Sequence, residues 1–236
     1  MTTMRLNGKV AVVTGGGRGI GRGIALALAS EGAHVVVCSR TLQELRAVEE
    51  EVRSQGGSAS AVKADVKSEQ DVAALAKTVL DRYGRVDVLV NNAGLGYLKP
   101  VSDLTVDEFD EMWKVNVRGV FLVTKAFLPS MMKAGSGAIV NIASLAGKNS
   151  FKGGAGYGST KWALRGFASS LMLEVRDYNI RVVTIFPGSV NTSFSSSGKK
   201  GDNIPRPEDV GAAVVFAVTA EGRAMFSEID LRPTKP

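Results

Sequence analysis

The chain is poor in the residues that build disulfide frameworks, zinc sites and histidine-dependent catalytic centres. Its 236 residues include one cysteine, Cys38, and one histidine, His34. A single cysteine excludes an intramolecular disulfide, and the two residues together cannot supply the ligands of a Cys/His zinc site. A Ser-His-Asp triad would have to use His34. Both residues belong to one apolar run, so we interpret them as structural and predict no metal site.

Long apolar runs and clusters of basic residues are also lacking. No uninterrupted apolar run approaches the roughly 20 residues of a membrane span, and the first residues lack a basic-then-apolar leader pattern. We therefore expect a cytoplasmic protein without a membrane partner. The net charge of +6 permits an acidic ligand. The basic residues are scattered and are not interleaved with aromatic residues, which argues against a nucleic-acid partner.

The chain is rich in short, valine-containing apolar runs. Five of them lack strict apolar and polar alternation, which is typical of strands covered on both faces. They span residues 10–14, 34–38, 86–90, 138–142 and 181–185, with weaker candidates at 58–64 and 226–231. Helical patterns lie between them at 18–31, 41–55, 68–83, 105–133, 155–178 and 207–219.

This alternation of strands and helices predicts parallel βαβ units. We expect an α/β fold, with a single Rossmann-type, doubly wound, mainly parallel sheet of about seven strands and helices on both faces. No repeat or linker divides the chain, so residues 1–236 are expected to form one domain. Ligands of such sheets bind beyond the carboxyl ends of the strands, so residues that follow the apolar runs are the functional candidates.

A glycine-rich segment, "TGGGRGIGRG", follows the first predicted strand and opens a helix. Glycines let the backbone approach a pyrophosphate, and the free N–H groups of a helix start attract it. The spacing is T-G-x-x-x-G-x-G rather than G-x-G-x-x-G. We predict a dinucleotide site here, and a turn that only packs helix on strand is the alternative. The predicted cofactor contacts are Gly15, Gly17, Arg18, Gly19, Ile20 and Gly21.

The end of the second predicted strand bears on the choice of cofactor. An acidic residue there would bind the ribose 2′-hydroxyl of NAD. This chain instead has Ser39 and Arg40, with no carboxylate before Glu44, and Arg18 can reach the same region. Charge-assisted hydrogen bonds from two arginines to a 2′-phosphate contribute about 1.5–3 kcal/mol each. We therefore predict NADP(H), the alternative being two solvated surface arginines.

Two further strand ends fit a cofactor site. Asp65 and Val66 follow the third strand, where Asp65 could meet the adenine amino group. The segment "NNAG" follows the fourth strand and supplies Asn92, Ala93 and Gly94. Its asparagines can bond to the backbone of neighbouring loops, and its small residues leave room for the cofactor.

The segment "YGSTK" places Tyr157 and Lys161 on one face of a predicted helix. A free tyrosine titrates near pH 10, and a nearby positive charge lowers such a pKa by about 1–3 units. We expect Lys161 and an oxidised nicotinamide to bring Tyr157 toward the pKa of a general acid/base. Ser144 lies just past the fifth strand, and Asn116 lies in the 105–133 helix. Taken singly, the tyrosine, serine and asparagine could also be interfacial, capping and polar helix residues.

Together these features resemble the short-chain dehydrogenase/reductase family. The resemblance covers essentially the whole chain. It rests on features in the family's order and spacing: "TGGGRGIG", "NNAG", Asn116, Ser144, "YGSTK" and "PGSVNT" at 187–192.

The resemblance implies a role for each catalytic candidate. Tyr157 would be the acid/base at the substrate oxygen, and Lys161 would hold the nicotinamide ribose and lower the tyrosine pKa. Ser144 would polarise the carbonyl, and Asn116 would position a water in a proton relay. The resemblance also implies cofactor contacts or turn-shaping roles for Pro187, Gly188, Val190 and Thr192.

Two places depart from the family's usual pattern. Residues 192–207, the expected substrate loop, are short and polar, which suggests an open cleft for a large or carrier-bound substrate; a mobile loop is the alternative. Lys199, Lys200 and Arg206 would make its edge basic. The last residues lack the glycine pair that often follows the final strand, which puts a tetramer built on C-terminal contacts in doubt. Helices at 105–133 and 155–178 still suit the family's dimer interface, so a homodimer or homotetramer is expected.

The function expected from the resemblance is NADPH-dependent reduction of a small-molecule or carrier-bound carbonyl, with 3-oxoacyl carrier-protein as the first substrate hypothesis. Another small ketone, a sugar, a pterin, a steroid or a polyol would use the same four catalytic residues, in either direction. A non-catalytic NADP-binding regulator is a further alternative, although such proteins usually lose the tyrosine or the lysine.

Overall fold

One parallel sheet organises the computed structural model, which describes residues 4–194 and 203–234. Its strand order is β3-β2-β1-β4-β5-β6-β7, and every neighbouring pair is parallel. The strands are β1 (Val10–Thr14), β2 (His34–Ser39), β3 (Ser58–Lys63), β4 (Val88–Asn91), β5 (Gly137–Ile142), β6 (Ile180–Pro187) and β7 (Glu228–Leu231). The predicted doubly wound sheet is therefore confirmed, including both weaker strand candidates.

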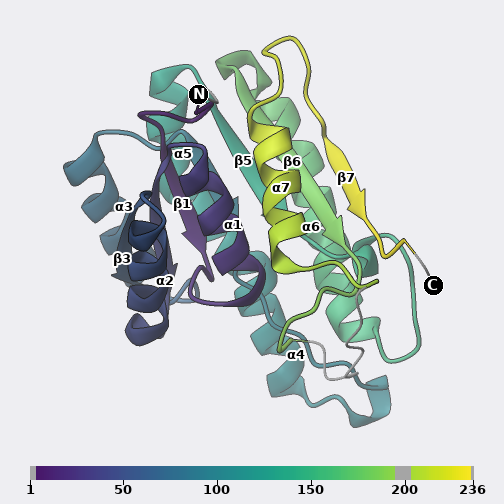
Figure 1. Ribbon diagram of the computed structural model, residues 1–236. Helices are drawn as coiled ribbons and strands as arrows, with labels where there is room; N and C mark the ends of the chain where they lie inside the picture. Colours follow the sequence, from purple (N-terminus) through teal and green to yellow (C-terminus); the bar gives the residue numbers. More distant parts are fainter. Residues whose placement is uncertain (1–3, 195–202, 235–236) are drawn as a thin grey trace.

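Helices cover the two faces of the sheet in two groups (Figure 1). The α-helices are α1 (Gly19–Ser30), α2 (Leu42–Ser54), α3 (Glu69–Tyr83), α4 (Val106–Trp113), α5 (Val120–Ala134), α6 (Ala155–Val175) and α7 (Pro207–Val218). Three short elements are η1 (Val101–Asp103), η3 (Leu145–Gly147) and η4 (Arg176–Tyr178). Helices α1, α2 and α7 pack into one core, and α3, α5 and α6 pack into the other. None of the helices in the described ranges is long and apolar enough to cross a membrane.

The valine runs have no apolar and polar alternation because each strand is buried on both faces. In β2, Val35 and Val37 belong to the core under α1, α2 and α7, while Val36 and Cys38 belong to the opposite core. Successive side chains of a strand point to opposite faces, so both sets must be apolar. Burying one such side chain contributes about 1.5–3 kcal/mol.

The two rare residues at the ends of β2 are structural, as predicted. His34 hydrogen-bonds through Nδ1 to Ser58 Oγ (2.6 Å) and through Nε2 to Ser60 Oγ (3.1 Å). Its ring packs against that of Tyr83, with centroids 4.5 Å apart. Cys38 is fully buried, and burial raises the pKa of its thiol to about 12, so the reactive thiolate is disfavoured.

The helical pattern predicted over 105–133 is confirmed, because the backbone is helical from Val106 to Ala134, but its α-helical geometry is interrupted. A π-helix, η2 (Lys114–Gly119), separates α4 from α5. A π-turn accommodates an extra residue, and here it carries Asn116, whose side chain bonds to Leu95 and Thr160. These partners are distant in the sequence, so helical periodicity in this segment does not reveal the interruption.

The order in which successive strands are added to the sheet reverses between β1 and β4, although all the strands run parallel. From β1 the strands proceed outward to β2 and β3 on one side, and from β4 to β7 on the other. A crevice forms beyond the carboxyl ends of the strands at such a switch point. The glycine turn after β1 and the segment after β4 border this crevice.

Candidate active site

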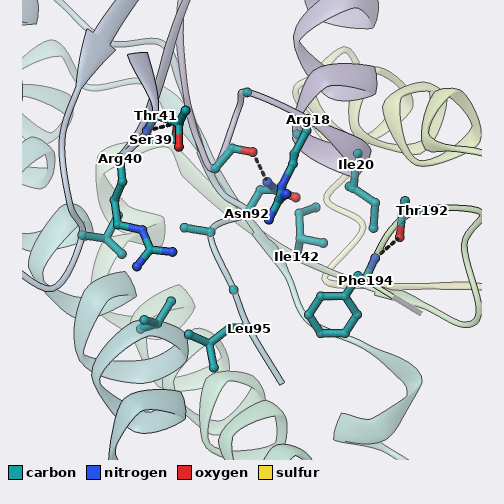
Figure 2. Close-up of a pocket in the computed structure, with 18 of the residues that line it drawn as sticks. Arg18, Ile20, Ser39, Arg40, Thr41, Asn92, Leu95, Ile142, Thr192 and Phe194 are labelled. Carbon is teal, nitrogen blue, oxygen red and sulfur yellow. Dashed lines mark hydrogen bonds between the residues drawn. The ribbon is translucent and has the colours of Figure 1, made fainter. Parts of the chain in front are cut away.

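A cavity of about 430 Å³ lies at the carboxyl ends of the central strands. Figure 2 shows part of its wall. Its volume falls within the about 300–1,000 Å³ common for ligand pockets. The wall contains most of the predicted cofactor residues: Gly15, Gly17, Arg18, Gly19, Ile20, Gly21, Ser39, Arg40, Asp65, Val66, Asn92, Ala93, Gly94, Tyr157, Lys161 and Thr192.

The glycine turn is built for close approach of backbone to backbone. A Cβ on Gly21 would lie 2.1 Å from the carbonyl oxygen of Gly15. Gly15 has a φ of +63°, and a Cβ there would lie 2.9 Å from the Cα of Ala93. No larger side chain fits at either position without displacing backbone. The turn therefore leaves the start of α1 open toward the cavity, which suits an anionic pyrophosphate.

Asn92 and Thr14 fix this turn against the loop after β4. The Asn92 side-chain amide donates to the carbonyl oxygens of Thr14 (2.9 Å) and Gly15 (3.1 Å). The Thr14 hydroxyl accepts from the backbone N–H groups of Asn92 and Ala93, each at 3.0 Å. The prediction that this asparagine bonds to neighbouring backbone is confirmed. These four hydrogen bonds hold the glycine turn after β1 to the loop after β4.

The outer end of the cavity carries the charged groups predicted from the sequence. In Figure 2, Arg18 extends from the glycine turn and Arg40 from the end of β2. Arg18 Nη1 lies 3.8 Å from Glu44 Oε1, and the Arg18 side chain is 74% exposed. Ser39 Oγ accepts from the backbone N–H of Thr41 at 3.3 Å. These groups, in solvent contact, could meet a phosphate without a large desolvation cost.

The inner end of the cavity holds Tyr157 and Lys161, which lie in the first two turns of α6. They are 8% and 4% exposed. Lys161 Nζ donates to the carbonyl oxygen of Ile142 at 3.1 Å and lies 5.6 Å from the centroid of the Tyr157 ring. Burial lowers the pKa of Lys161 to about 8, because the ammonium ion is removed from water.

The pKa of Tyr157 differs from the sequence-based expectation. Burial raises it to about 12, while a hydrogen bond with the Ser144 hydroxyl acts in the opposite direction. The part of that expectation that rests on Lys161 is corrected, because desolvation of the phenolate dominates. The part that rests on an oxidised nicotinamide stays a prediction. Lys161 is itself desolvated, so part of the charge that was expected to act on the tyrosine is lost near pH 8 and above.

Five predicted residues, all in the described part of the chain, lie outside the cavity wall: Asn116, Ser144, Pro187, Gly188 and Val190. Ser144 follows β5 by two residues, and its hydroxyl accepts from the N–H of Ala146 at 3.1 Å. It nevertheless interacts with the buried Tyr157. The serine therefore adjoins the tyrosine although it does not itself line the cavity.

Asn116 is fully buried behind the wall. Its Oδ1 accepts from the N–H of Leu95 (2.9 Å), and its Nδ2 donates to the Leu95 carbonyl (2.8 Å) and to Thr160 Oγ1 (3.0 Å). A Cβ on Gly94 would lie 3.4 Å from Asn116 Oδ1 and 3.6 Å from Lys161 Nζ. The asparagine thus joins the loop after β4 to α6 beside the buried lysine.

The segment after β6 leads from the sheet to the cavity, which it reaches at Thr192. Gly188 donates its N–H to the Leu231 carbonyl at 2.8 Å, and Val190 is buried in the core. Thr192 lines the cavity, and a Cβ on Gly19 would lie 3.5 Å from its methyl carbon.

Of the basic residues predicted for the loop edge, Lys199 and Lys200 lie outside the described residues. Arg206 precedes α7, and its N–H donates to Asp209 Oδ2 at 2.7 Å.

Sequence reasoning missed part of the wall: Thr41, Glu44, Ala64, Leu95, Val115, Ile142, Ala143, Ser193 and Phe194. The strand-end rule could have found Ala64, Ile142 and Ala143, which end or directly follow strands. Phe194 had no such signal. Its ring lies 5.9 Å from that of Tyr157, and this contact depends on the course of the loop after β6.

Comparison with known proteins was consistent with these observations. The family model for the short chain dehydrogenase matches residues 9–203. The sepiapterin reductase of Chlorobaculum tepidum is 36% identical over 236 residues, covering 95% of this chain and 96% of that protein.

Solved structures share the architecture over nearly the whole chain. A metagenomic short-chain oxidoreductase, determined in complex with NADP, is 40% identical, with a TM-score of 0.88, and the match covers 98% of this chain and 100% of that one. An alcohol dehydrogenase from the archaeon Thermococcus sibiricus, complexed with 5-hydroxy-NADP, is 35% identical. Its TM-score is 0.90, and 97% of each chain is covered.

Proposed function

The chain belongs to the short-chain dehydrogenase family, and we propose that it transfers a hydride between NADP(H) and a carbonyl or secondary alcohol. The observation that carries this proposal is the buried pair of Tyr157 and Lys161 at the inner end of a cavity whose outer end is cationic. The NADP and 5-hydroxy-NADP complexes of two similar structures support the choice of cofactor.

The chain's own residues would handle the proton and the orientation of the substrate. The cofactor, when bound, supplies or accepts the hydride. Tyr157 would donate its proton to the substrate oxygen during reduction, and Ser144 would hydrogen-bond to the same oxygen. A pKa of about 12 keeps Tyr157 protonated at neutral pH, which is the form that reduction requires.

Lys161 and Asn116 would act from behind the tyrosine. The lysine ammonium, held by the Ile142 carbonyl, would bind the ribose hydroxyls and supply positive charge near the phenol. Asn116 fixes the Leu95 backbone beside that ammonium group, which supports a part in proton transfer between Lys161 and solvent. At the outer end, Arg18, Ser39 and Arg40 would bind the 2′-phosphate.

Reduction of a 3-oxoacyl group on a carrier protein is the first substrate hypothesis, based on the short loop at 192–207. The name of the Chlorobaculum relative favours a second candidate, a small ketone carried on the planar ring of a pterin. The Phe194 ring beside Tyr157 supports an apolar or planar group next to the reacting carbonyl. Both substrates would use the same catalytic residues.

We also propose that the chain acts as one domain and assembles as a homodimer or homotetramer. The seven strands form one sheet, which supports the single domain. Phe109, Phe121, Trp162 and Leu173 expose large apolar side chains on α4, α5 and α6. Exposed large apolar side chains on these helices support an association surface there. Light scattering coupled to gel filtration would give the oligomeric state.

The decisive experiment follows NADPH consumption with an acetoacetyl carrier-protein thioester and with a panel of small ketones, including a pterin. We expect Tyr157→Phe to lower kcat by roughly 10²–10⁴-fold on whichever substrate turns over. NADPH affinity, measured by fluorescence, should be unchanged because only the phenolic oxygen is removed.

Tyr178→Phe removes the same oxygen from an exposed tyrosine at η4 and is the matched control. Full activity in Tyr157→Phe would contradict the assigned acid/base. Tight NADPH binding without turnover of any substrate in the panel would favour the non-catalytic regulator.

A further inference from the structure

Glu44 brings a carboxylate into the outer wall of the cavity, between the glycine turn and the end of β2. A Cβ on Gly17 would lie 3.0 Å from Glu44 Cβ, 3.3 Å from Glu44 Oε2 and 3.4 Å from Ser39 Oγ. The carboxylate and the serine hydroxyl therefore face the same small space above Gly17. On its other side, Glu44 Oε1 lies 3.8 Å from Arg18 Nη1.

The surroundings of this carboxylate are those that suit an anion. Arg18 supplies a guanidinium group and Ser39 a hydroxyl. The third component is the start of α2, where Glu44 sits in the first turn and the Thr41 side chain, within the described chain, makes no capping hydrogen bond. The N-terminus of a helix stabilises negative charge through its free N–H groups. Glu44 thus occupies a site to which a phosphate would also be attracted.

These are the groups that the proposed function assigns to the 2′-phosphate of NADP(H). Two anions cannot share the same cations without repulsion. The Arg18–Glu44 contact is exposed, at 74% and 38% of the two side chains, so it is weak enough to be exchanged for a stronger one. A carboxylate near a ribose has a second conceivable role, that of accepting hydrogen bonds from the 2′-hydroxyl of NAD(H). The two roles predict opposite effects when the charge is removed.

We infer that Glu44 is a resident counter-anion of Arg18 that competes with the cofactor's 2′-phosphate and thereby limits affinity for the phosphorylated cofactor. This inference rests on the proposed use of NADP(H). When the phosphate binds, Arg18 leaves Glu44 and pairs with the phosphate. The carboxylate charge of Glu44 then repels the bound phosphate. Glu44 is therefore a specificity-determining residue that acts against the cofactor preference set by Arg18 and Arg40.

The test compares two ligands that differ only by the phosphate, adenosine 2′,5′-bisphosphate and adenosine 5′-monophosphate. Their dissociation constants are measured by titration calorimetry with the wild-type chain and with Glu44→Gln. We expect the variant to bind the bisphosphate about three- to tenfold more tightly and the monophosphate equally well. The gain should shrink as salt rises above about 0.15 M. NADPH should follow the bisphosphate, and NADH the monophosphate.

Glu49→Gln is the matched control, because it removes the same charge from the same helix. Its carboxylate hydrogen-bonds to Arg53 at 3.0 Å, away from the cavity wall. We expect no change in any of the four dissociation constants for this variant. A gain of the same size in Glu49→Gln would mean that overall charge rather than position is responsible, which would overturn the inference.

Three further outcomes separate this inference from the proposed cofactor. Equal bisphosphate binding by wild type and Glu44→Gln overturns the inference, while tight NADPH binding by both leaves the proposed function standing. Weaker monophosphate and NADH binding by the variant overturns it in favour of the ribose role. If wild type binds the monophosphate better than the bisphosphate and Glu44→Gln reverses this order, the inference stands and the proposed preference for NADP(H) fails.

Discussion

The two ends of the cavity use positive charge in opposite ways. At the outer end, Arg18 is 74% exposed and adjoins Glu44. At the inner end, Lys161 is 4% exposed, and its ammonium group donates to the Ile142 carbonyl. Solvent screens the guanidinium group of Arg18, so its charged form costs little free energy. Its ion pair with Glu44 is weak and can be replaced by a stronger anion. The ammonium group of Lys161 is desolvated, which lowers its pKa to about 8, so its charged form costs free energy.

The comparison suggests that binding and chemistry have been given different environments. A cofactor phosphate must enter and leave, so weakly held, hydrated partners suit the outer end. The proton transfer that we propose for Tyr157 and Lys161 needs a fixed geometry and shifted pKa values, and burial provides both. Mutations at the inner end should therefore have the larger effects on turnover, and those at the outer end should change cofactor preference.

The largest effect is expected for Lys161→Met, which keeps the shape of the buried side chain and removes its charge. We expect kcat/KM to fall by roughly 10²–10⁴-fold because the tyrosine loses its charged neighbour. The fold should instead become more stable. Lowering the lysine pKa to about 8 corresponds to a cost of about 3 kcal/mol below pH 8. Loss of the bond to Ile142 offsets roughly 1 kcal/mol of the gain.

The pH dependence of stability provides a second measurement on the same variant. Between pH 8 and about 10.5, the folded wild-type lysine is neutral while the unfolded lysine still binds a proton. The free energy of unfolding of wild type should thus rise relative to Lys161→Met as pH increases across this window. The difference should largely vanish near pH 10.5. Lys77→Met, an exposed lysine on α3, should show neither effect, and a destabilised Lys161→Met would contradict the burial cost.

A smaller effect is expected at the glycine turn, which lines the cavity. In Gly21→Ala the new Cβ would lie 2.1 Å from the Gly15 carbonyl oxygen, so the turn must shift. We expect unfolding to become easier by about 2–4 kcal/mol and NADPH affinity to fall with it. Urea denaturation and fluorescence titration would measure the two quantities.

Gly166→Ala is the control for the loss of glycine itself. A Cβ at Gly166, on α6, meets no atom within 4 Å. The free energy of unfolding of this variant should rise by about 0.5–1 kcal/mol, because alanine is more favourable than glycine inside a helix. Equal stability of the two alanine variants would show that the turn tolerates a Cβ.

The smallest effect is expected at the exposed outer end. Arg40→Asp should reduce the preference for NADPH over NADH by roughly tenfold or more, because a repulsive carboxylate replaces a phosphate-binding cation. The ratio of kcat/KM values for the two cofactors measures this change. Arg46→Asp makes the same substitution at an exposed position on α2 and should leave the ratio unaltered. An unchanged ratio in Arg40→Asp would contradict the assignment of this arginine to the 2′-phosphate.

Much of the fold and most of the cavity wall follow from local rules. The five central strands are buried along most of their length and need continuous apolar runs, so they were recognisable from valine-rich segments, and the edge strands β3 and β7 from weaker ones. Strand ends of a parallel sheet converge at one edge, which brought Gly15, Ser39 and Asn92 to one cavity as predicted. The interruption at 114–119 was not recognisable, because the partners of Asn116 lie in a loop and in another helix.

The sequence by itself determined which residue types stand at the carboxyl edge of the sheet, because glycine geometry, apolar periodicity and helix spacing are properties of neighbouring residues. Only the tertiary structure decided how those residues behave. Burial, which depends on segments far apart in the chain, moved the pKa of Tyr157 up and that of Lys161 down. The same long-range packing brought Glu44 beside Arg18 and Phe194 beside Tyr157. Electrostatic environment and cavity shape are sums over the whole fold, so no single stretch of sequence contains them.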